Sequence, residues 1–383
     1  MEIPNVNHTR KGLFSVGGVD VAIDGSWLVI FALVVGGLAL GYFPTVDPGR
    51  AAASYWLISV VVALLFFVSI LLHELAHAWV SNRFGVEVKR ITLFIFGGAA
   101  QLSAEPADPR TELEIAIAGP LTSLGLGLVF GAAAWGLGEA GSLEAASAGA
   151  RYLAYANVAV ALFNSLPGLP LDGGRIARSI FWRRSRDFRG ATIRAAEWGK
   201  VVAGGLMGFG ALDALLGNLI GGLWFVLIGS FLRTAAEASR REALVDRSLQ
   251  GLTVADLMVS APQVVEAEES VAGAVERQFL HHGFGGFPVM DDGRPIGILS
   301  LREVRACPRH ERPQRRVREI MRATEASVIV SPADAIATAL RRMSEADCSR
   351  LLVIENGRLL GLITRSRIAS VLHARRLLEG DGA

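Results

Sequence analysis

The chain has 383 residues, 51% of them hydrophobic, and a formal net charge of +2 at pH 7. This length allows two or three domains, and so small a net charge points by itself to no class of charged partner. The only two cysteines, Cys307 and Cys348, support neither a disulfide framework nor a cysteine zinc site. Long apolar segments occupy residues 25 to about 235, and charges recur every few residues after them. We therefore expect a membrane half followed by a soluble α/β half.

Six stretches approach the roughly 20 apolar residues that a helix needs to cross a bilayer. They are residues 25–43, 54–80, 112–137, 149–166, 198–216 and 218–233. A polar arm, residues 1–24, precedes the first stretch and argues against a cleavable signal. Arginine and lysine are concentrated in alternate loops, so the positive-inside rule predicts a multi-pass cell-membrane protein with both termini cytoplasmic. We interpret the basic run at 175–200 as a topology anchor and expect no nucleic-acid partner.

The second stretch contains two histidines and a glutamate in the segment ILLHELAHAWV. His73 and His77 are four residues apart, so on a helix both side chains leave the same face and can share one metal ion. Glu74 lies next to them and can act on a water held by that ion. An acid at the centre of a membrane helix costs from about 2.5 kcal/mol upward, which favours a functional role. The alternative is that the three polar residues only bridge neighbouring helices.

A catalytic zinc ion commonly has three protein ligands and an open position. The five remaining histidines lie outside the membrane half and are interpreted as surface or turn residues: His8, His281, His282, His310 and His373. The third ligand is therefore expected to be a carboxylate, either Asp172 or Asp213. Asp172 is favoured because it is predicted at the same cytoplasmic end as the histidines, in a segment broken by prolines and glycines. Irregular backbone at membrane depth occurs where it is buried in protein or lines a wet cavity.

The soluble half contains an internal repeat with a period of roughly 63 residues. VADLM at 254–258 recurs as VREIM at 317–321, and FPVMDDGRPIGILSLRE at 287–303 recurs as LLVIENGRLLGLITRSR at 351–367. Each copy predicts a hairpin closed by Asp292-Gly293 or Asn356-Gly357, with helices on either side. The repeat resembles a tandem pair of CBS domains. We expect the two domains at 252–310 and 315–375, after a linker at 236–251.

The CBS resemblance implies a sensor of adenine nucleotides, in which a Ser/Thr-x-x-Asp pattern holds the ribose. The first copy has Ser300 and Glu303, which keeps the carboxylate of the pattern, whereas the second has Thr364 and Arg367. Arg367 departs from the pattern and puts a ribose site in the second copy in doubt, although an arginine suits a phosphate. Ser300, Glu303 and Thr364 are the candidate nucleotide-binding residues. The alternative is a CBS pair that only forms a homodimer or packs under the membrane half.

Four motifs of the membrane half occur in a fixed order. They are HELAH in a span, the glycine pair of LFIFGGAAQL at 93–102, AGPLTSLG at 118–125 and NSLPGLPLDGGR at 164–175. Over about residues 15–235 they resemble the site-2 proteases, the intramembrane zinc metalloproteases of peptidase family M50. The resemblance implies a six-helix core at 25–235, with one zinc ion held by His73, His77 and Asp172.

The resemblance also implies roles for two further residues. Glu74 would be the general base, and Asn164 would lie near the scissile carbonyl, where its amide can stabilise an oxyanion. A helix-end cap is the alternative for Asn164. Family members cut a transmembrane or membrane-adjacent helix of a substrate, often an anti-sigma factor or a membrane-tethered regulator. We therefore expect regulated intramembrane proteolysis, modulated by the CBS pair.

Two motifs have more than one interpretation. The run at 93–102 is either a strand whose edge binds the unwound substrate or a hairpin that only packs. AGP at 118–120 is interpreted as close helix packing. For the whole chain, the alternative to a polytopic helical membrane protease with a cytoplasmic α/β CBS pair is a CBS-gated transporter or channel with a His/Glu/Asp cation site. The glutamate beside the histidines favours the protease, and the presence of all the presumed site residues disfavours an inactive scaffold.

Overall fold

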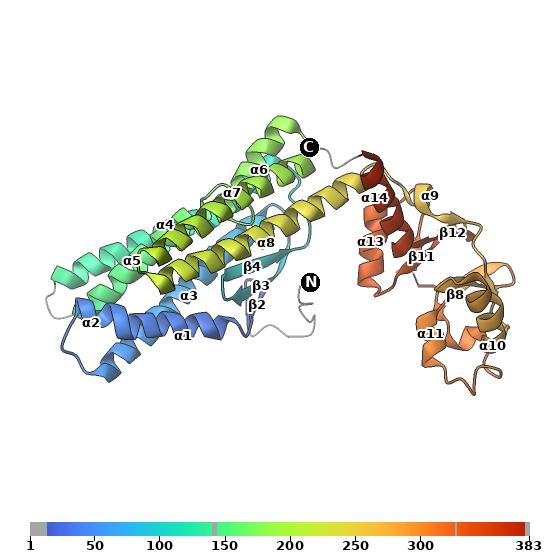
Figure 1. Cartoon of the computed structure of the whole chain (residues 1–383), viewed down its shortest axis with the longest axis horizontal. Coiled ribbons are helices and arrows are strands. Elements are labelled where there is room, and N and C mark those ends of the chain that lie inside the picture. Colours follow the sequence, from blue (N-terminus) through green and yellow to red (C-terminus); the bar gives the residue numbers. More distant parts are fainter. Residues whose placement is uncertain (1–13, 140–143, 326–327, 380–383) are drawn as a thin grey trace. The chain divides into compact units, whose positions relative to one another are not determined.

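The computed structural model describes residues 14–139, 144–325 and 328–379 (Figure 1). The chain divides into two compact units, Met1–Ala243 and Leu244–Ala383, which are described in turn. The first unit is mainly helical and contains one small sheet, whereas the second contains two small sheets and short helices.

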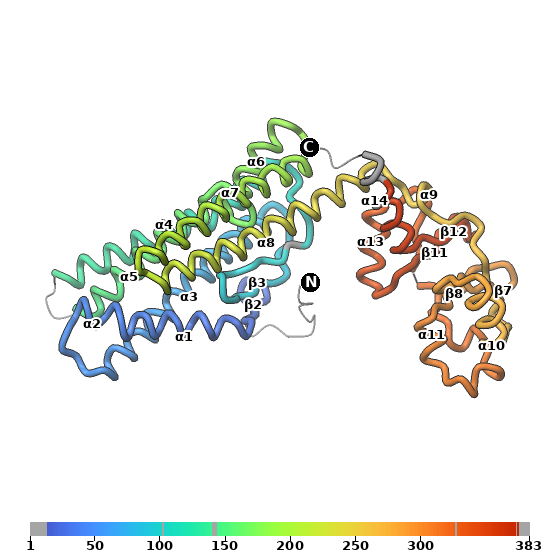
Figure 2. Tube along the Cα trace, in the orientation of Figure 1, coloured from blue at the N-terminus to red at the C-terminus, as the bar shows by residue number. Residues whose placement is uncertain are grey.

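Each predicted span overlaps helices of the first unit. They are α1 (Trp27–Gly37), the π-helical turn η1 (Leu38–Tyr42), α2 (Phe43–Val46), α3 (Ala52–Arg83), α4 (Pro109–Glu139), α5 (Glu144–Asn164), α6 (Asp172–Ser185), α7 (Phe188–Leu215) and α8 (Leu219–Leu249). The trace in Figure 2 follows α8 without a break, and its last residues belong to the second unit.

Four segments of the described chain are long and apolar enough to cross a membrane. They are Trp27–Val46, Ala52–Arg83, Pro109–Glu139 and Leu219–Leu249. The predicted spans at 149–166 and 198–216 overlap α5 and α7, which are not among the four. Both helices carry charged residues and are rich in alanine and glycine, which contribute less hydropathy than leucine or valine. The count of six spans is thus not confirmed, whereas the polytopic helical class is.

The small sheet of the first unit has the strand order β1-β2-β3-β4. Its strands are β1 (Phe14–Val16), β2 (Val19–Ile23), β3 (Val88–Phe94) and β4 (Gly97–Leu102), and only β2 and β3 run parallel. Gly17 and Gly18 close the first hairpin with φ of +59° and +85°, which glycine adopts readily. Residues 14–23, expected in a polar arm, are therefore part of the folded unit.

The sheet lies against the helix that carries the two histidines. Val19, Ile91 and Leu93 are buried together with Ala78 of α3 in one apolar cluster. Helix α4 packs against α3, α5 and α6, and α6 packs in turn against α7. Helix α4 therefore contacts both α3, which carries the two histidines, and α6, which begins at Asp172.

The second unit contains two four-stranded sheets. One consists of β6 (Val265–Glu266), β7 (Gly286–Asp291), β8 (Arg294–Ser300) and β9 (Arg322–Ala323); the other consists of β10 (Ile329–Val330), β11 (Arg350–Glu355), β12 (Arg358–Thr364) and β5 (Val259–Ser260). The helical segments are α9 (Val254–Leu257), α10 (Val271–Ala274), the π-helical η2 (Val275–Leu280), α11 (Leu301–Ala306), α12 (Val317–Ile320), α13 (Ile336–Glu345) and α14 (Arg365–Glu379).

The two sheets exchange their edge strands. β5 comes from the first sequence copy but pairs with β12 of the second, and β9 comes from the second copy but pairs with β8 of the first. Both predicted hairpin turns are present, with φ of 47° and 77° at Asp292-Gly293 and 51° and 76° at Asn356-Gly357. The copies at 252–310 and 315–375 are therefore interlocked, which the repeat alone does not reveal.

Candidate metal centre

Two imidazoles and one carboxylate meet between α3 and the start of α6. Nε2 of His73 is 3.1 Å from Oδ2 of Asp172, and Nε2 of His77 is 3.2 Å from Oδ1 of the same carboxylate. The two Nε2 atoms are 3.3 Å apart. His73 and His77 are only 3% and 5% exposed. The structure thus brings together the three residues expected to hold a metal ion.

The spacing of these three groups fits a zinc ion. One ligand atom of each residue lies within 4.8 Å of the other two. Zinc–ligand bonds of about 2.0–2.2 Å in a tetrahedral arrangement separate the ligand atoms by about 3.3–3.6 Å. The separations between the imidazole nitrogens and the carboxylate are close to this range. Two histidines and one carboxylate also leave the fourth position of a tetrahedron free, as in catalytic zinc sites.

The other nitrogen of each imidazole is held by α4. Nδ1 of His77 is 2.7 Å from the carbonyl oxygen of Ile115, which only accepts hydrogen bonds, so Nδ1 carries the proton. Nδ1 of His73 is 2.9 Å from Oγ of Ser123. Hydrogen bonds of this kind orient metal-binding histidines and leave the lone pair of Nε2 for the ion.

Gly119 provides the space in which the two histidines meet. A Cβ atom at this position would lie 2.2 Å from Nε2 of His77 and 2.5 Å from Nε2 of His73. The AGP motif was interpreted as close helix packing, and the close neighbours of its glycine are the ligand rings themselves. The four-residue spacing of Gly119 and Ser123 places both on one face of α4, a signal that the sequence contained.

The side chain of Glu74, a residue of α3, lies beside the strand β4. A Cβ at Gly98 would lie 2.5 Å from Cγ of Glu74 and 2.9 Å from its Oε1. The glycine pair of the motif at 93–102 therefore lets β4 pass directly beside this carboxylate. β4 is also the last strand in the order of its sheet, so in the described part of the chain one of its edges has no strand partner.

The remaining polar candidates of the membrane half lie in two different places. Asn164 is the last residue of α5 and is half-buried, directly before the irregular segment 165–171 that leads to Asp172. Asp213, the competing carboxylate, is near the end of α7 and accepts a hydrogen bond of 2.8 Å from the side chain of Asn218. The structure assigns Asp213 to a local turn contact.

The other histidines lie apart from this centre in the described chain. His281, His282 and His310 are exposed, in agreement with their interpretation as surface residues. His8 and the side chain of His373 lie outside the described residues.

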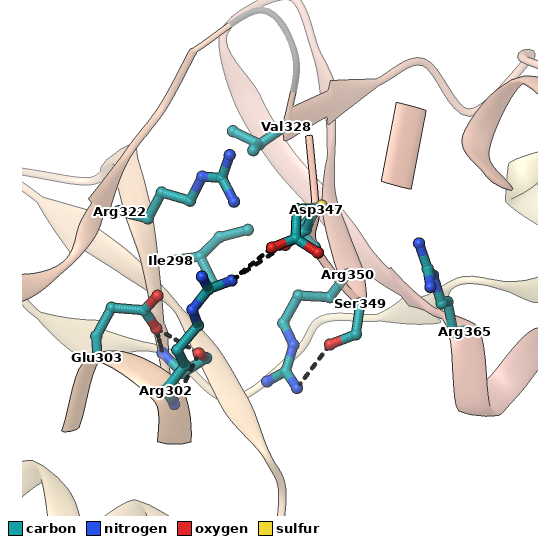
Figure 3. Close-up of a pocket in the computed structure, with 11 residues that line it drawn as sticks. Ile298, Arg302, Glu303, Arg322, Val328, Asp347, Ser349, Arg350 and Arg365 are labelled. Carbon is teal, nitrogen blue, oxygen red and sulfur yellow. Dashed lines mark hydrogen bonds and ion pairs between the residues drawn. The ribbon is translucent and has the colours of Figure 1, made fainter. Parts of the chain in front are cut away.

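A cleft of about 240 Å³ occupies the second unit, between the two sequence copies (Figure 3). Ser300 and Glu303 line it, whereas Thr364 does not. The carboxylate of Glu303 accepts hydrogen bonds from both the backbone N–H and the hydroxyl of Ser300, as a helix cap. Thr364 instead contacts Ser366 and accepts a hydrogen bond from the backbone N–H of Arg367. Of the three candidate nucleotide-binding residues, only the two from the first copy therefore line the cleft.

Four arginines that the sequence reasoning missed line the same cleft: Arg302, Arg322, Arg350 and Arg365. Arg302 is paired with Asp347 at 2.9 Å across the cleft (Figure 3). Burial lowers the pKa of the Arg350 guanidinium from its ordinary value, and the Nε of this residue is buried without a hydrogen-bond partner among the described residues. These arginines come from both sequence copies, so only the folded unit collects them.

Comparisons with known proteins identify a family for each unit of the chain. The family model of Peptidase family M50 matches residues 61–150 and 140–203, and that of the CBS domain matches residues 254–308 and 317–374. Rip3 of Mycobacterium tuberculosis, whose name describes a zinc metalloprotease, is 35% identical over 368 residues, which is 96% of this chain and 93% of that protein. The Synechocystis protein sll0528, with a similar name, is 31% identical over 387 residues and 96% of both chains.

A solved structure, the site-2 protease from Methanocaldococcus jannaschii, is 26% identical with a TM-score of 0.41, covering 60% of this chain and 94% of that chain. The two relatives above are similar over both units of the chain, and their names describe metalloproteases. The transporter or channel is therefore set aside, and the family implies zinc as the metal. The chain belongs to peptidase family M50, the site-2 protease family of intramembrane zinc metalloproteases, and carries a CBS domain pair in its second unit.

Proposed function

We propose that this membrane protease cuts its substrate at the centre formed by His73, His77 and Asp172, within or next to a transmembrane segment. The observation that carries the proposal is the meeting of three ligand atoms from α3 and α6 within 4.8 Å. Glu74 follows His73 directly on α3 and lies beside β4.

Each residue of the proposed centre has a separate task. His73, His77 and Asp172 hold zinc, which when bound polarises a carbonyl and lowers the pKa of a water. Glu74 takes a proton from the attacking water and passes it to the leaving amine. Asn164 donates a hydrogen bond from its side-chain amide to the developing oxyanion.

The free edge of β4 is the proposed binding site for the substrate backbone. A helix hydrogen-bonds its own peptide groups, so a substrate segment must unwind before a peptide bond can be cut. An extended segment added to a sheet edge regains those hydrogen bonds. Gly98 lies on β4 beside Glu74, which supports a strand that presents substrate rather than a hairpin that only packs.

The substrates and the topology follow from the same proposal. Suitable substrates are membrane proteins with a single cleavable span, such as an anti-sigma factor or a membrane-tethered regulator. The arginine-rich loops support an orientation in the cell membrane with both termini in the cytoplasm. A cytoplasmic CBS pair would then meet soluble ligands of the cell.

An adenine nucleotide is the proposed ligand of the cleft in the second unit. Ser300 lines the cleft and is the proposed ribose ligand, while Arg350 and the neighbouring arginines offer charge to phosphate groups. Glu303 is engaged as a cap of α11, so its part is to hold Ser300 in place. Thr364 lies outside the cleft lining, which weakens its candidacy as a ligand residue.

Helix α8 supports modulation of the protease by this unit. Phe231 stacks on Phe96, next to the β4 glycines, with ring centroids 4.2 Å apart. Leu232 is buried against Leu171, which directly precedes the third proposed ligand. At the other end of the helix, Leu249 is buried in the core of the second unit. Because α8 contributes residues to both units, it supports the proposal that a ligand of the second unit modulates the protease.

A homodimer through the CBS pair is the last part of the proposal. Leu280, Phe284 and Leu301 are exposed on the second unit, and exposed apolar side chains of this size are typical of interfaces. Sedimentation of the full-length protein in detergent should give the mass of two chains, and charged substitutions at Leu280 and Phe284 should give one.

The test of the proposed function is a comparison of membrane-protein fragments in cells that produce wild-type protein or Glu74→Gln. Cells with the wild-type protein should contain fragments that end within or next to a transmembrane segment, and cells with the variant should lack them. Zinc content should be equal in both proteins, because Glu74 is not a ligand. Glu114→Gln, a surface change on α4, is the control that should leave cleavage unchanged. Cleavage by the Glu74→Gln protein would exclude Glu74 as the base.

A further inference from the structure

A buried carboxylate of α4 holds two arginines of α6 close to the metal centre. Glu112 is fully buried, and its Oε1 accepts hydrogen bonds from Nε of Arg175 at 3.3 Å and from Nη2 of Arg178 at 2.5 Å. The arginine side chains are only 18% and 16% exposed. Further along α6, Ser179 donates a hydrogen bond of 2.7 Å to the carbonyl oxygen of Pro109, the first residue of α4. Three polar contacts thus join the two helices.

These contacts lie on the helix faces that also build the metal centre. One face of α4 contains four residues at intervals of three or four: Glu112, Ile115, Gly119 and Ser123. The last three hold or make room for the histidine rings. On α6, Arg175 is three residues after the third proposed ligand and lies on the same side of the helix. The hydrogen bond between Glu112 and Arg175 therefore lies next to the metal site, on the same faces of α4 and α6.

The cluster is costly to bury, which argues against stability as its main role. Oε2 of Glu112, Nη2 of Arg175 and Nε of Arg178 are buried without a hydrogen-bond partner in the described part of the chain. Well-packed apolar side chains of similar volume often hold two elements together at least as strongly as a buried ion pair. Hydrogen bonds, unlike apolar contacts, form at only one register of the two helices.

We propose that Glu112 is a positioning residue of the zinc centre. By holding Arg175 and Arg178 it sets the register of α6 on α4, and thereby the carboxylate of Asp172 relative to the two histidines. The proposal rests on the proposed function, since it takes Asp172 as a zinc ligand. Asp172 is the first residue of α6, so any slide of this helix moves it. A slip of one residue is about 1.5 Å, whereas zinc–ligand distances tolerate about 0.2 Å.

The test compares Glu112→Gln with Glu114→Gln in the full-length protein. Glu114 lies on the same helix and pairs at the surface with Arg110 at 2.8 Å, so it is a matched loss of one carboxylate. Zinc affinity is measured by competition with a chelator. We expect the zinc Kd to rise about 10- to 100-fold in Glu112→Gln, as for other residues that orient metal ligands, and to stay unchanged in Glu114→Gln. The value of kcat should fall with zinc occupancy, while KM changes little.

A purely structural role of Glu112 makes the opposite prediction. The zinc-free variant would then unfold at a lower temperature and bind zinc with wild-type affinity, which would overturn the positioning role. Should Glu112→Gln not fold, Arg178→Lys keeps the charge but loses the fork of the guanidinium, and the same zinc measurement decides. Asp172→Asn separates the two proposals. If it keeps wild-type zinc affinity, the ligand assignment fails; if only Glu112→Gln does, the positioning role alone fails.

Discussion

Gly119 lies so close to His77 that a Cβ atom at position 119 would be 2.2 Å from Nε2 of that histidine. The close approach of α4 to α3 is therefore part of the metal site. This approach requires a residue without a side chain on α4. The same helix contacts α3, which carries the two histidines, and α6, which begins at Asp172.

Gly119→Ala should remove zinc binding while the protein stays folded. The added methyl group occupies the space where the Nε2 atoms of the two histidines meet, so the rings cannot keep their positions. We expect zinc below one-tenth of the wild-type content after dialysis, measured by atomic absorption, and no detectable proteolysis. Gly125→Ala on the same helix is the matched control, because a Cβ there meets nothing within 4 Å. Full zinc content in Gly119→Ala would contradict the site geometry.

Ser123→Ala should weaken zinc binding without abolishing it. The hydroxyl of Ser123 holds Nδ1 of His73 at 2.9 Å, and loss of such a contact typically costs about 10- to 100-fold in metal affinity. Chelator competition measures the effect. Thr122→Ala is the control, since the Thr122 hydroxyl donates its hydrogen bond to the carbonyl oxygen of Ala118 in its own helix. Equal zinc affinity in the two variants would remove Ser123 from the site.

Gly98→Ala should separate zinc binding from catalysis. The new methyl group would lie 2.5 Å from Cγ of Glu74, so the carboxylate or the strand β4 must shift. We expect full zinc content and a loss of kcat of about 100-fold or more, within the range attributed to general acid–base catalysis. Cleavage of a purified substrate and metal analysis of the same sample provide both readouts. Loss of zinc in this variant would mean that β4 supports the ligands rather than the base.

Arg350→Ala should weaken nucleotide binding to the second unit. Arg350 combines a lowered guanidinium pKa with a buried Nε that has no partner among the described residues, and an anionic ligand would supply one. Calorimetry with ATP or AMP on the full-length protein should show a Kd at least tenfold higher than in wild type. Arg341→Ala, an exposed change on α13 away from the cleft, should leave the Kd unchanged. Absence of heat with wild-type protein and every adenine nucleotide would exclude this ligand class.

Most residues of the candidate metal centre can be predicted from the sequence. The spacing of the two histidines is a local pattern, and only two carboxylates were candidates for the third ligand. The four-residue spacing of His73 and His77 is a property of any helix, so their shared face needs no tertiary knowledge. The sequence favours Asp172 over Asp213 because Asp172 is predicted at the same cytoplasmic end of the membrane segments as the two histidines. In the structure Asp172 contacts both imidazoles, whereas Asp213 accepts a hydrogen bond from the side chain of Asn218.

The membrane topology and the CBS cleft were predicted less completely. Helices rich in alanine and glycine, such as α5, are less apolar than leucine- and valine-rich spans, so a count of spans from apolar runs is sensitive to a few residues. The CBS motif predicts Thr364 as a nucleotide-binding residue. In the structure the neighbouring Arg365 lines the cleft, and Thr364 does not. Strand exchange between the copies moves residues relative to a sequence repeat in a way that the repeat does not encode.

By itself, the sequence determined the groups from which the chemistry of this protein is proposed: two histidines with helical spacing and an adjacent acid in an apolar segment, a candidate carboxylate to complete the site, and a repeated α/β tail. Only the tertiary structure decided which other residues orient these groups. Gly119, Ser123 and Glu112 act across helices, and their roles depend on which faces of α3, α4 and α6 meet. Helical periodicity specifies a face but not its neighbour, so contacts between helices distant in the chain become visible only when the helices are packed.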